Sequence, residues 1–164
     1  MRHTFLFIGF IFITTLLQAQ KEVEQVILLN DINIQIDASS ALDDMYNFKF
    51  EAAEEKYNKL KNNYPWHPLP YFLLGLSEWW KIMPNLNDKQ YDADFMYYME
   101  TTIAICENLM KKRPEYEVEA SFFLSACYGF IGRLESSEER KNWTKSAFAG
   151  RNALKYLEKS KGKE

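Results

Sequence analysis

The stretch Ala53–Gly75, AEEKYNKLKNNYPWHPLPYFLLG, holds the end of one helical pattern and the start of another. Apolar residues in and just before its first half recur at the spacing of one helix face. They are Phe50, Ala53, Tyr57, Leu60 and Tyr64. Pro65 follows this pattern, and a second pattern runs from about Leu69 to Met83, just before Pro84. The stretch therefore predicts two helices, over about 50–62 and 69–83, with a short turn between them.

The second of these helices contains Gly75, although glycine in a helix interior costs about 1 kcal/mol relative to alanine. A close approach by a neighbouring helix would explain this glycine. The same helix is apolar on nearly all sides, so other elements are expected to cover both of its faces.

The stretch resembles the tetratricopeptide repeat (TPR) family, whose unit is a pair of antiparallel helices of about 34 residues in total. In a unit that starts at Ile34, the alanine, aromatic residue and proline of the family pattern fall on Ala53, Tyr57 and Pro65. The next unit starts at Pro68 without a gap, and its large residue, leucine and glycine fall on Tyr71, Leu74 and Gly75. A third unit from about Val118 places Leu124, Ser125 and Tyr128 at equivalent positions.

The resemblance implies an all-α fold in which antiparallel helix pairs stack as a short TPR-like α-solenoid over residues 34–164. Its units would be about 34–67, 68–117 and 118–160, with the residues named above packed between the helices. The pattern is imperfect, because Asp37, Ser40 and Asp44 stand where bulky residues are expected. A plain helical bundle is the alternative architecture.

Three further helical patterns follow Pro84. The first covers about 91–112, and the second covers about 117–131 and would end at Gly132, in the position of a C′ glycine. Ser136 and Glu139 have the spacing of a capping box for a last helix that continues to about Ser160. The apolar stripe of this last helix is Trp143, Ala147, Gly150, Leu154 and Leu157.

Residues 20–33 form an N-terminal segment whose structure the sequence leaves open. The segment Val23–Ile34 fits a helix, whereas the alternation of Ile32, Ile34 and Ile36 fits a strand equally well. Asp37 could cap a short helix over 38–46.

Residues 1–19 read as a secretory signal peptide, with a basic start, an apolar run and the small residue Ala19. An uncleaved membrane anchor is the alternative, although the run is short for a membrane span, and no later segment is apolar enough for stable membrane insertion. We therefore expect an exported protein, periplasmic or secreted. Loss of Arg2 would make the net charge one unit more negative than the −3 of the full chain. Nothing in this charge suggests a nucleic-acid partner, which would need a basic face.

The two cysteines, Cys106 and Cys127, are not expected to form a disulfide. If the chain turns near Pro114, the two residues are offset by about 7.5 Å along the helix axes, at about 1.5 Å per residue. This offset already exceeds the usual distance of at most about 6.8 Å between disulfide-bonded Cα atoms.

The sequence lacks the residue patterns that usually indicate a catalytic site. His67 is the only histidine beyond the leader, which excludes a paired-histidine zinc site, and between Trp66 and Pro68 it reads as a turn residue. No phosphate-binding loop or nucleophile elbow is present. Asp88, Asp92 and Asp94 fit a helix start better than a calcium loop. We therefore expect no enzyme, no metal and no cofactor.

The resemblance implies a concave binding surface lined by the first helix of each unit. The corresponding residues are mostly apolar: Leu69, Phe72, Leu76, Trp79, Phe122, Ala126 and Phe130. Such a groove would suit a peptide or an amphipathic helix of another protein. The sequence thus favours a non-enzymatic protein–protein interaction scaffold of the cell envelope. The alternatives are a helical pocket for a small apolar ligand, and burial of these side chains under the protein's own long helices.

The apolar stripe of the last helix has no following helix to cover it, whereas repeat arrays normally end with a polar cap. The segment Val23–Ile34 could fold back over it, a second copy could dock in a homodimer, or the chain could be part of a longer array. We favour one of the last two arrangements.

Overall fold

The computed structural model describes residues 28–162, which form six α-helices and two short 3-10 helices without a strand. The α-helices are α1 (Ile32–Tyr46), α2 (Phe50–Asn63), α3 (Pro68–Ile82), α4 (Asp92–Lys112), α5 (Glu117–Glu135) and α6 (Trp143–Ser160). The 3-10 helices are η1 (Leu28–Asn30) and η2 (Pro114–Tyr116). The all-α prediction is confirmed. The predicted signal peptide, 1–19, and most of the segment 20–33 lie outside the described residues.

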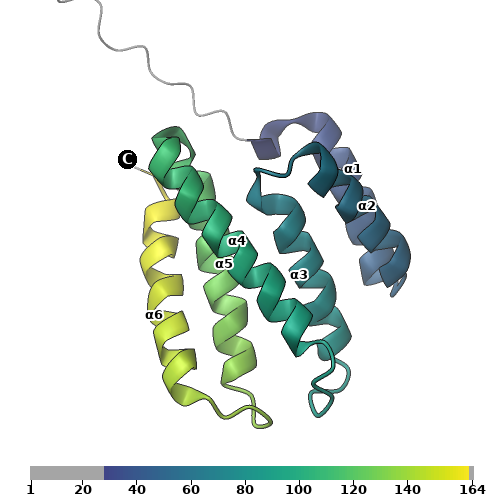
Figure 1. Ribbon diagram of the computed structural model, residues 1–164, viewed down its shortest axis with the longest axis vertical. Helices are drawn as coiled ribbons and strands as arrows, with labels where there is room; N and C mark the ends of the chain where they lie inside the picture. The colour runs from purple at the N-terminus through teal and green to yellow at the C-terminus, as the bar shows by residue number, and fades with distance from the viewer. Residues whose placement is uncertain (1–27, 163–164) are drawn as a thin grey trace, which may run out of the picture.

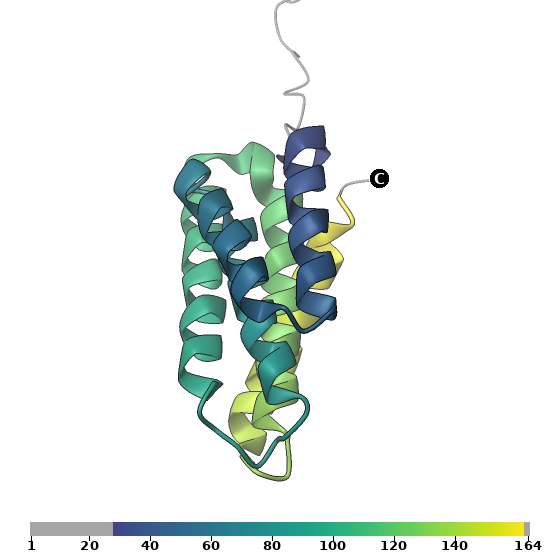
Figure 2. The same cartoon turned by 90° about the vertical axis from the view of Figure 1, so that its right-hand side faces the viewer.

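Consecutive helices run in opposite directions and each packs against the next, from α1 to α6 (Figure 1). Beyond these sequential neighbours, α3 also contacts α5. Helices α1 and α6 lie at opposite edges of the molecule, so that α6 lies behind α1 when the molecule is turned (Figure 2). Among helices built from residues 28–162, none is long and apolar enough to cross a membrane.

Two clusters of buried side chains hold the helices together. The first joins α1 and α2 to α3, α4 and α5 and contains Ala53, Tyr57 and Leu74. The second joins the lower parts of α3, α4 and α5 to Ala149 of α6. Helices α3, α4 and α5 contribute to both clusters, which makes them the centre of the fold.

The close approach expected at Gly75 is confirmed. A Cβ atom at this position would lie 2.8 Å from Met99 Cε and 3.2 Å from Tyr98 Cβ, both on α4. Ala53 and Tyr57 are fully buried, as the predicted packing of these residues requires. Tyr71 is half-buried, and its hydroxyl donates a hydrogen bond to the carbonyl of Pro65 in the turn that precedes α3 (3.2 Å).

The start of the described chain differs from the prediction. Ile32, Ile34 and Ile36 belong to α1 and not to a strand, and Asp31, not Asp37, caps this helix. The Asp31 carboxylate accepts a hydrogen bond from the backbone N–H of Asn33 at 2.8 Å. Ile34 is buried against the first cluster while Ile32 and Ile36 face outward, because a helix separates residues that a strand would place on one side.

The boundary between the last two helices was also predicted wrongly. Helix α5 continues through Gly132 to Glu135, and Ser136 ends it instead of capping α6. Gly132 lies against Ala149 and Ser146 of α6, so this glycine permits close helix packing and does not terminate a helix. The side chain of Asn142 accepts a hydrogen bond from the backbone of Lys145 and forms the actual N-cap of α6.

The predicted apolar stripe of α6 does not face the core. Trp143, Leu154 and Leu157 are between 46% and 67% exposed, whereas Ala149 is the buried residue of this helix. Helix α6 instead packs on α5 through Ser146, Ala149 and Ala153. The two cysteines are buried and unbonded, as expected. Burial raises the pKa of both thiols, which therefore remain protonated.

Candidate binding groove

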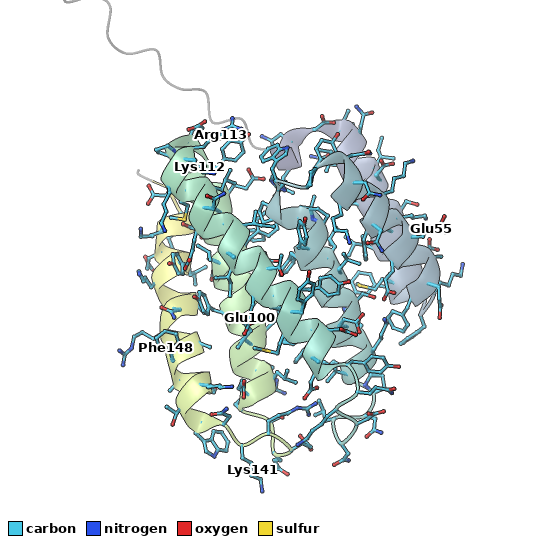
Figure 3. All side chains as sticks on the ribbon, viewed as in Figure 1. Glu55, Glu100, Lys112, Arg113, Lys141 and Phe148 are labelled. Carbon is cyan, nitrogen blue, oxygen red and sulfur yellow. The ribbon has the colours of Figure 1, made fainter. Side chains whose placement is uncertain are left out.

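A groove of about 560 Å³ lies between α4 and α6, with α5 between them. Glu100 on α4 and Phe148 on α6 mark its two sides in Figure 3. Its apolar lining consists of Met96, Ile103, Ala104, Tyr128, Ile131, Phe148 and Ala149. Glu100, Glu107, Glu135, Thr144 and Lys145 complete the lining. The groove is thus an apolar channel with a charged border.

One face of α4 supplies a whole side of the groove. Met96, Glu100, Ile103, Ala104 and Glu107 follow one another at helical spacing, so their side chains lie in one row. The adjacent face of α4, with Phe95, Met99 and Cys106, is buried in the two core clusters. Helix α4 therefore holds the row in place through its buried face.

Negative charge dominates the border. Glu100 and Glu107 are exposed on α4, and Glu135 is buried near the end of α5. The only positive group in the lining is the Lys145 ammonium, whose Nζ lies 3.5 Å from Glu135 Oε1. Two carboxylates thus remain without a cation in the groove, which favours a ligand that carries positive charge.

Phe148 and Tyr128 are the aromatic residues of the groove. Phe148 is 64% exposed, an unusual exposure for a phenylalanine that borders an apolar surface. The Tyr128 ring is stacked on that of Tyr156 with 5.9 Å between centroids, which fixes its position. Burial, followed by the nearby Glu107 carboxylate, raises the pKa of the Tyr128 hydroxyl. This phenol therefore stays neutral and can only donate or accept hydrogen bonds.

The residues predicted to line a concave surface lie on α3 and α5, outside this groove. Leu69 and Trp79 are buried at 8% exposure, which leaves little of either side chain for a ligand. Phe130 contacts Phe72 and Trp79, with ring centroids 6.1 Å and 5.3 Å apart. Leu76 and Ala126 are half-buried, and Phe122 is exposed. Three members of this set, Phe72, Trp79 and Phe130, thus pack together where α3 meets α5.

His67 has a larger structural role than a turn residue. Its ring is fully buried at the start of α3, where Nδ1 accepts a hydrogen bond from the backbone N–H of Leu69 at 3.1 Å. Because Nδ1 accepts, Nε2 carries the hydrogen and donates it to Glu119 Oε1 at 3.2 Å. No local sequence pattern predicts this pair, because fifty-two positions separate its members.

A second polar cluster, which is partly buried, joins α2 and α3. The Lys81 ammonium contacts Glu54 Oε1 at 2.6 Å and Glu78 Oε1 at 2.9 Å, and Ser77 donates to the same Glu54 oxygen. Burial raises the pKa of Glu78, and the hydrogen bond from Lys81 offsets part of this effect. The Lys81 ammonium stays charged, because the two carboxylates outweigh the effect of burial and raise its pKa.

No family model, curated protein or solved structure matches this chain. Across residues 28–162, no three side chains of His, Cys, Asp or Glu gather in a way that could hold a metal ion. The groove between α4 and α6 thus combines apolar area with two carboxylates, Glu100 and Glu107, that no cation of its lining pairs with.

Proposed function

We propose that this protein is a non-enzymatic, exported, TPR-like scaffold that binds a segment of another protein in the groove between α4 and α6. The segment would be an amphipathic helix with apolar residues on one face and lysine or arginine beside them. The observation that carries the proposal is an apolar groove bordered by Glu100 and Glu107 without a matching cation. This location replaces the surface between α3 and α5 that the sequence suggested, because Leu69 and Trp79 are buried there.

The shape of the groove supports a peptide as its ligand. The lining residues on α4 extend from Met96 to Glu107, which corresponds to about 16 Å at about 1.5 Å per residue. A bound helix of three turns has about this length. Helix-in-groove binding relies on a row of apolar anchors, and Met96, Ile103 and Phe148 offer apolar area to such a row.

The stacking of helix pairs also supports a scaffold. Antiparallel helices that each pack on the next leave long surfaces along the molecule, and proteins with this arrangement use such surfaces for binding. The TPR resemblance of Ala53, Tyr57, Leu74 and Gly75 is consistent with this, since all four are buried between helices.

The groove volume favours a second candidate function. A pocket of about 560 Å³ falls within the range of about 300–1,000 Å³ that is typical of small-molecule sites. An apolar molecule with one cationic group would satisfy both the lining and the charge. The same residues would then bind a small ligand instead of a helix.

Fluorescence anisotropy with designed helical peptides tests the proposal. Two labelled peptides would share one leucine face and differ only in having lysine or glutamate on the polar face. We expect the lysine peptide to bind, and we expect its affinity to fall as salt is added. The double variant Glu100→Lys, Glu107→Lys should weaken binding by about tenfold or more, because it reverses the charge of the border.

Glu55→Lys provides the matched control, because Glu55 is exposed on α2, far from the groove (Figure 3). It should leave binding of the lysine peptide unchanged. Equal binding of both peptides, or no loss in the double variant, would contradict the proposed role of the groove. An apolar fluorescent dye with an ammonium group tests the second candidate. Tight binding of the dye together with no binding of either peptide would favour that candidate.

A further inference from the structure

The two edges of the molecule expose apolar side chains on helices of opposite net charge, α1 and α6. At one edge, α1 presents Ile32, Ile36, Ser39 and Asp43 along its outer side, where they line a shallow hollow of about 510 Å³. We call these residues the α1 row. At the other edge, α6 presents Trp143, Ala147, Gly150, Leu154 and Leu157, which we call the α6 row. The lining of the groove between α4 and α6 does not include the α6 row.

Both rows are incompletely covered by the described residues. Ile32 and Ile36 are 62% and 60% exposed, and Trp143 and Leu154 are exposed to a similar degree. Large apolar side chains gathered on one helix face mark an interaction surface more often than single exposed ones do. Each row can therefore accept a partner.

Charge distinguishes the two helices. Helix α1 contains three aspartates and no basic residue, whereas α6 contains four basic residues and one glutamate. Some of these charges are satisfied locally, since Asp44 pairs with Lys56 and Lys159 pairs with Glu117. Asp43 on α1 and Arg151 on α6 are exposed, and neither forms an ion pair within the described part of the chain.

We propose that copies of this chain associate head to tail, with α1 of one copy packed antiparallel against the α6 row of the next. The partner of each edge is thus the opposite edge of a second copy. This contact would repeat the alternation of helix directions found from α1 to α6. It is heterologous, so the assembly extends with concentration unless the rotation between copies closes a ring.

The antiparallel arrangement matches side chains along both rows. If Ile36 lies against Leu154, then Ile32 lies beside Leu157 and the apolar halves of the two rows meet. Asp43 then falls opposite Ala147, one helical turn from Arg151, within reach of its long side chain.

The small residues fall at the middle of this contact. In the same register Ser40, which borders the α1 hollow, lies opposite Gly150. A Cβ atom on Gly150 would meet no atom within 4 Å in its own chain. This glycine is therefore free to accept the backbone of a second helix at close range, unlike Gly132, whose space α6 already fills.

Sedimentation velocity of the purified protein over a range of concentrations tests this inference. The average mass should rise with concentration and fall again at high salt, because the contact includes exposed opposite charges. Asp43→Lys and Arg151→Glu should each weaken association by about tenfold or more, since each places like charges across the contact. A mixture of the two variants should associate, because the unchanged α1 of one fits the unchanged α6 of the other.

Association of the mixture separates head-to-tail packing from a symmetric contact. If α6 packed on α6, Asp43→Lys would have no effect, and that result would overturn the proposal. A protein that remains monomeric at all concentrations would overturn it as well. Gly150→Met provides a steric variant that should stay folded, by circular dichroism, and lose association.

Two controls keep this test independent of the groove. Glu100→Lys changes the groove on α4, and Lys112→Glu changes an exposed cation at the end of α4 (Figure 3). Neither should alter self-association. Loss of association in Glu100→Lys would place the contact in the groove and overturn the head-to-tail arrangement.

Discussion

The buried pair of His67 and Glu119 joins the start of α3 to the start of α5. The His67 ring caps α3 through Leu69 and donates to one Glu119 oxygen, while the other Glu119 oxygen is buried without a hydrogen-bond partner. The ring edge also packs against Phe123, with centroids 5.8 Å apart. The His67 side chain thus caps a helix, donates a hydrogen bond to one oxygen of a buried carboxyl group and packs against an aromatic ring.

We predict that His67→Ala lowers the free energy of unfolding by about 2–4 kcal/mol. The loss combines the helix cap, worth about 1 kcal/mol, with the cost of leaving Glu119 buried without its donor, about 1–3 kcal/mol. Urea denaturation measures the change. The double variant His67→Ala, Glu119→Ala should be less destabilised than the sum of the single variants, because the second change removes the unpaired carboxyl group. Additive effects would show that the two side chains are not coupled.

Glu78 makes stability depend on pH. Because burial raises its pKa above the ordinary glutamate value, the folded protein holds this proton more tightly than the unfolded chain does. In the pH window between those two values, acidification therefore adds stability and a rise in pH removes it. Asp44 acts in the opposite direction at lower pH, because the hydrogen bond from Lys56 lowers its pKa.

Glu78→Gln should remove this dependence and leave the protein more stable at neutral pH than the original chain. The glutamine can still accept a hydrogen bond from Lys81 but carries no buried charge. Urea midpoints of both proteins, measured at neutral and mildly acidic pH, check the expectation. The difference between the two should shrink as the pH falls toward the ordinary glutamate pKa. A constant difference would mean that Glu78 does not titrate in this window.

The helical glycines differ in whether a neighbouring helix already fills the space that a side chain at the glycine position would need. Gly75 of α3 lies against Met99 and Tyr98 of α4, whereas Gly129 of α5 has no such neighbour within 4 Å. We predict that Gly75→Leu destabilises the protein by about 2–3 kcal/mol or more, because the added side chain overpacks the contact between α3 and α4. Thermal unfolding measures the loss.

Gly129→Leu is the matched control, with the same replacement in another helix interior. It should stabilise the protein by about 0.5–1 kcal/mol, because leucine is a better helix former than glycine and meets open space. Equal effects at the two glycines would show that helix propensity alone, without the contact with α4, determines the role of Gly75.

Helix positions could be predicted wherever local signals and packing agree. The helices expected over 50–62, 69–83 and 91–112 differ from α2, α3 and α4 by one residue at most at either end. Proline and asparagine mark their ends and also lie in turns of the folded chain. The start predicted at 117 and the end predicted at about Ser160 are confirmed, but the boundary between the last two helices was predicted wrongly, because Gly132 and Ser136 resemble end and start signals. At these positions the packing of α5 against α6 determines where the helix ends, and the local sequence pattern does not.

The groove could not be found from the sequence for a related reason. Its lining comes from three helices. On α4, Glu100, Ile103 and Glu107 lie beside the most buried face of the helix and not within it. Phe148 likewise lies off the predicted stripe of α6. A sequence pattern identifies the face that is most apolar, but a groove forms where the less apolar faces of several helices meet. The same limit explains why Leu69 and Trp79, read as groove residues, turned out to be buried.

In the molecule as a whole, burial is concentrated at the centre and declines toward α6. Helices α3 and α5 contribute many side chains to the two core clusters, whereas among the described residues α6 contributes the buried Ala149 and the partly buried Tyr156. Helix α6 lies close to α5 because Gly132 and Ala149 are small, but small residues bury little apolar area. The contact between α5 and α6 is therefore close, but it adds little to the free energy that holds α6 in place.

We therefore predict that hydrogen exchange, measured by mass spectrometry at low protein concentration, is slowest in α3 and α5 and fastest in α6. Opening α6 removes only Ala149 and the partly buried Tyr156 from the two core clusters, whereas opening α3 or α5 exposes both clusters. Uniform protection of all six helices would contradict this ranking. The same measurement at high concentration bears on head-to-tail packing. Association should slow exchange in both α1 and α6, because α1 of each copy covers α6 of the next. It should leave exchange in α3 unchanged.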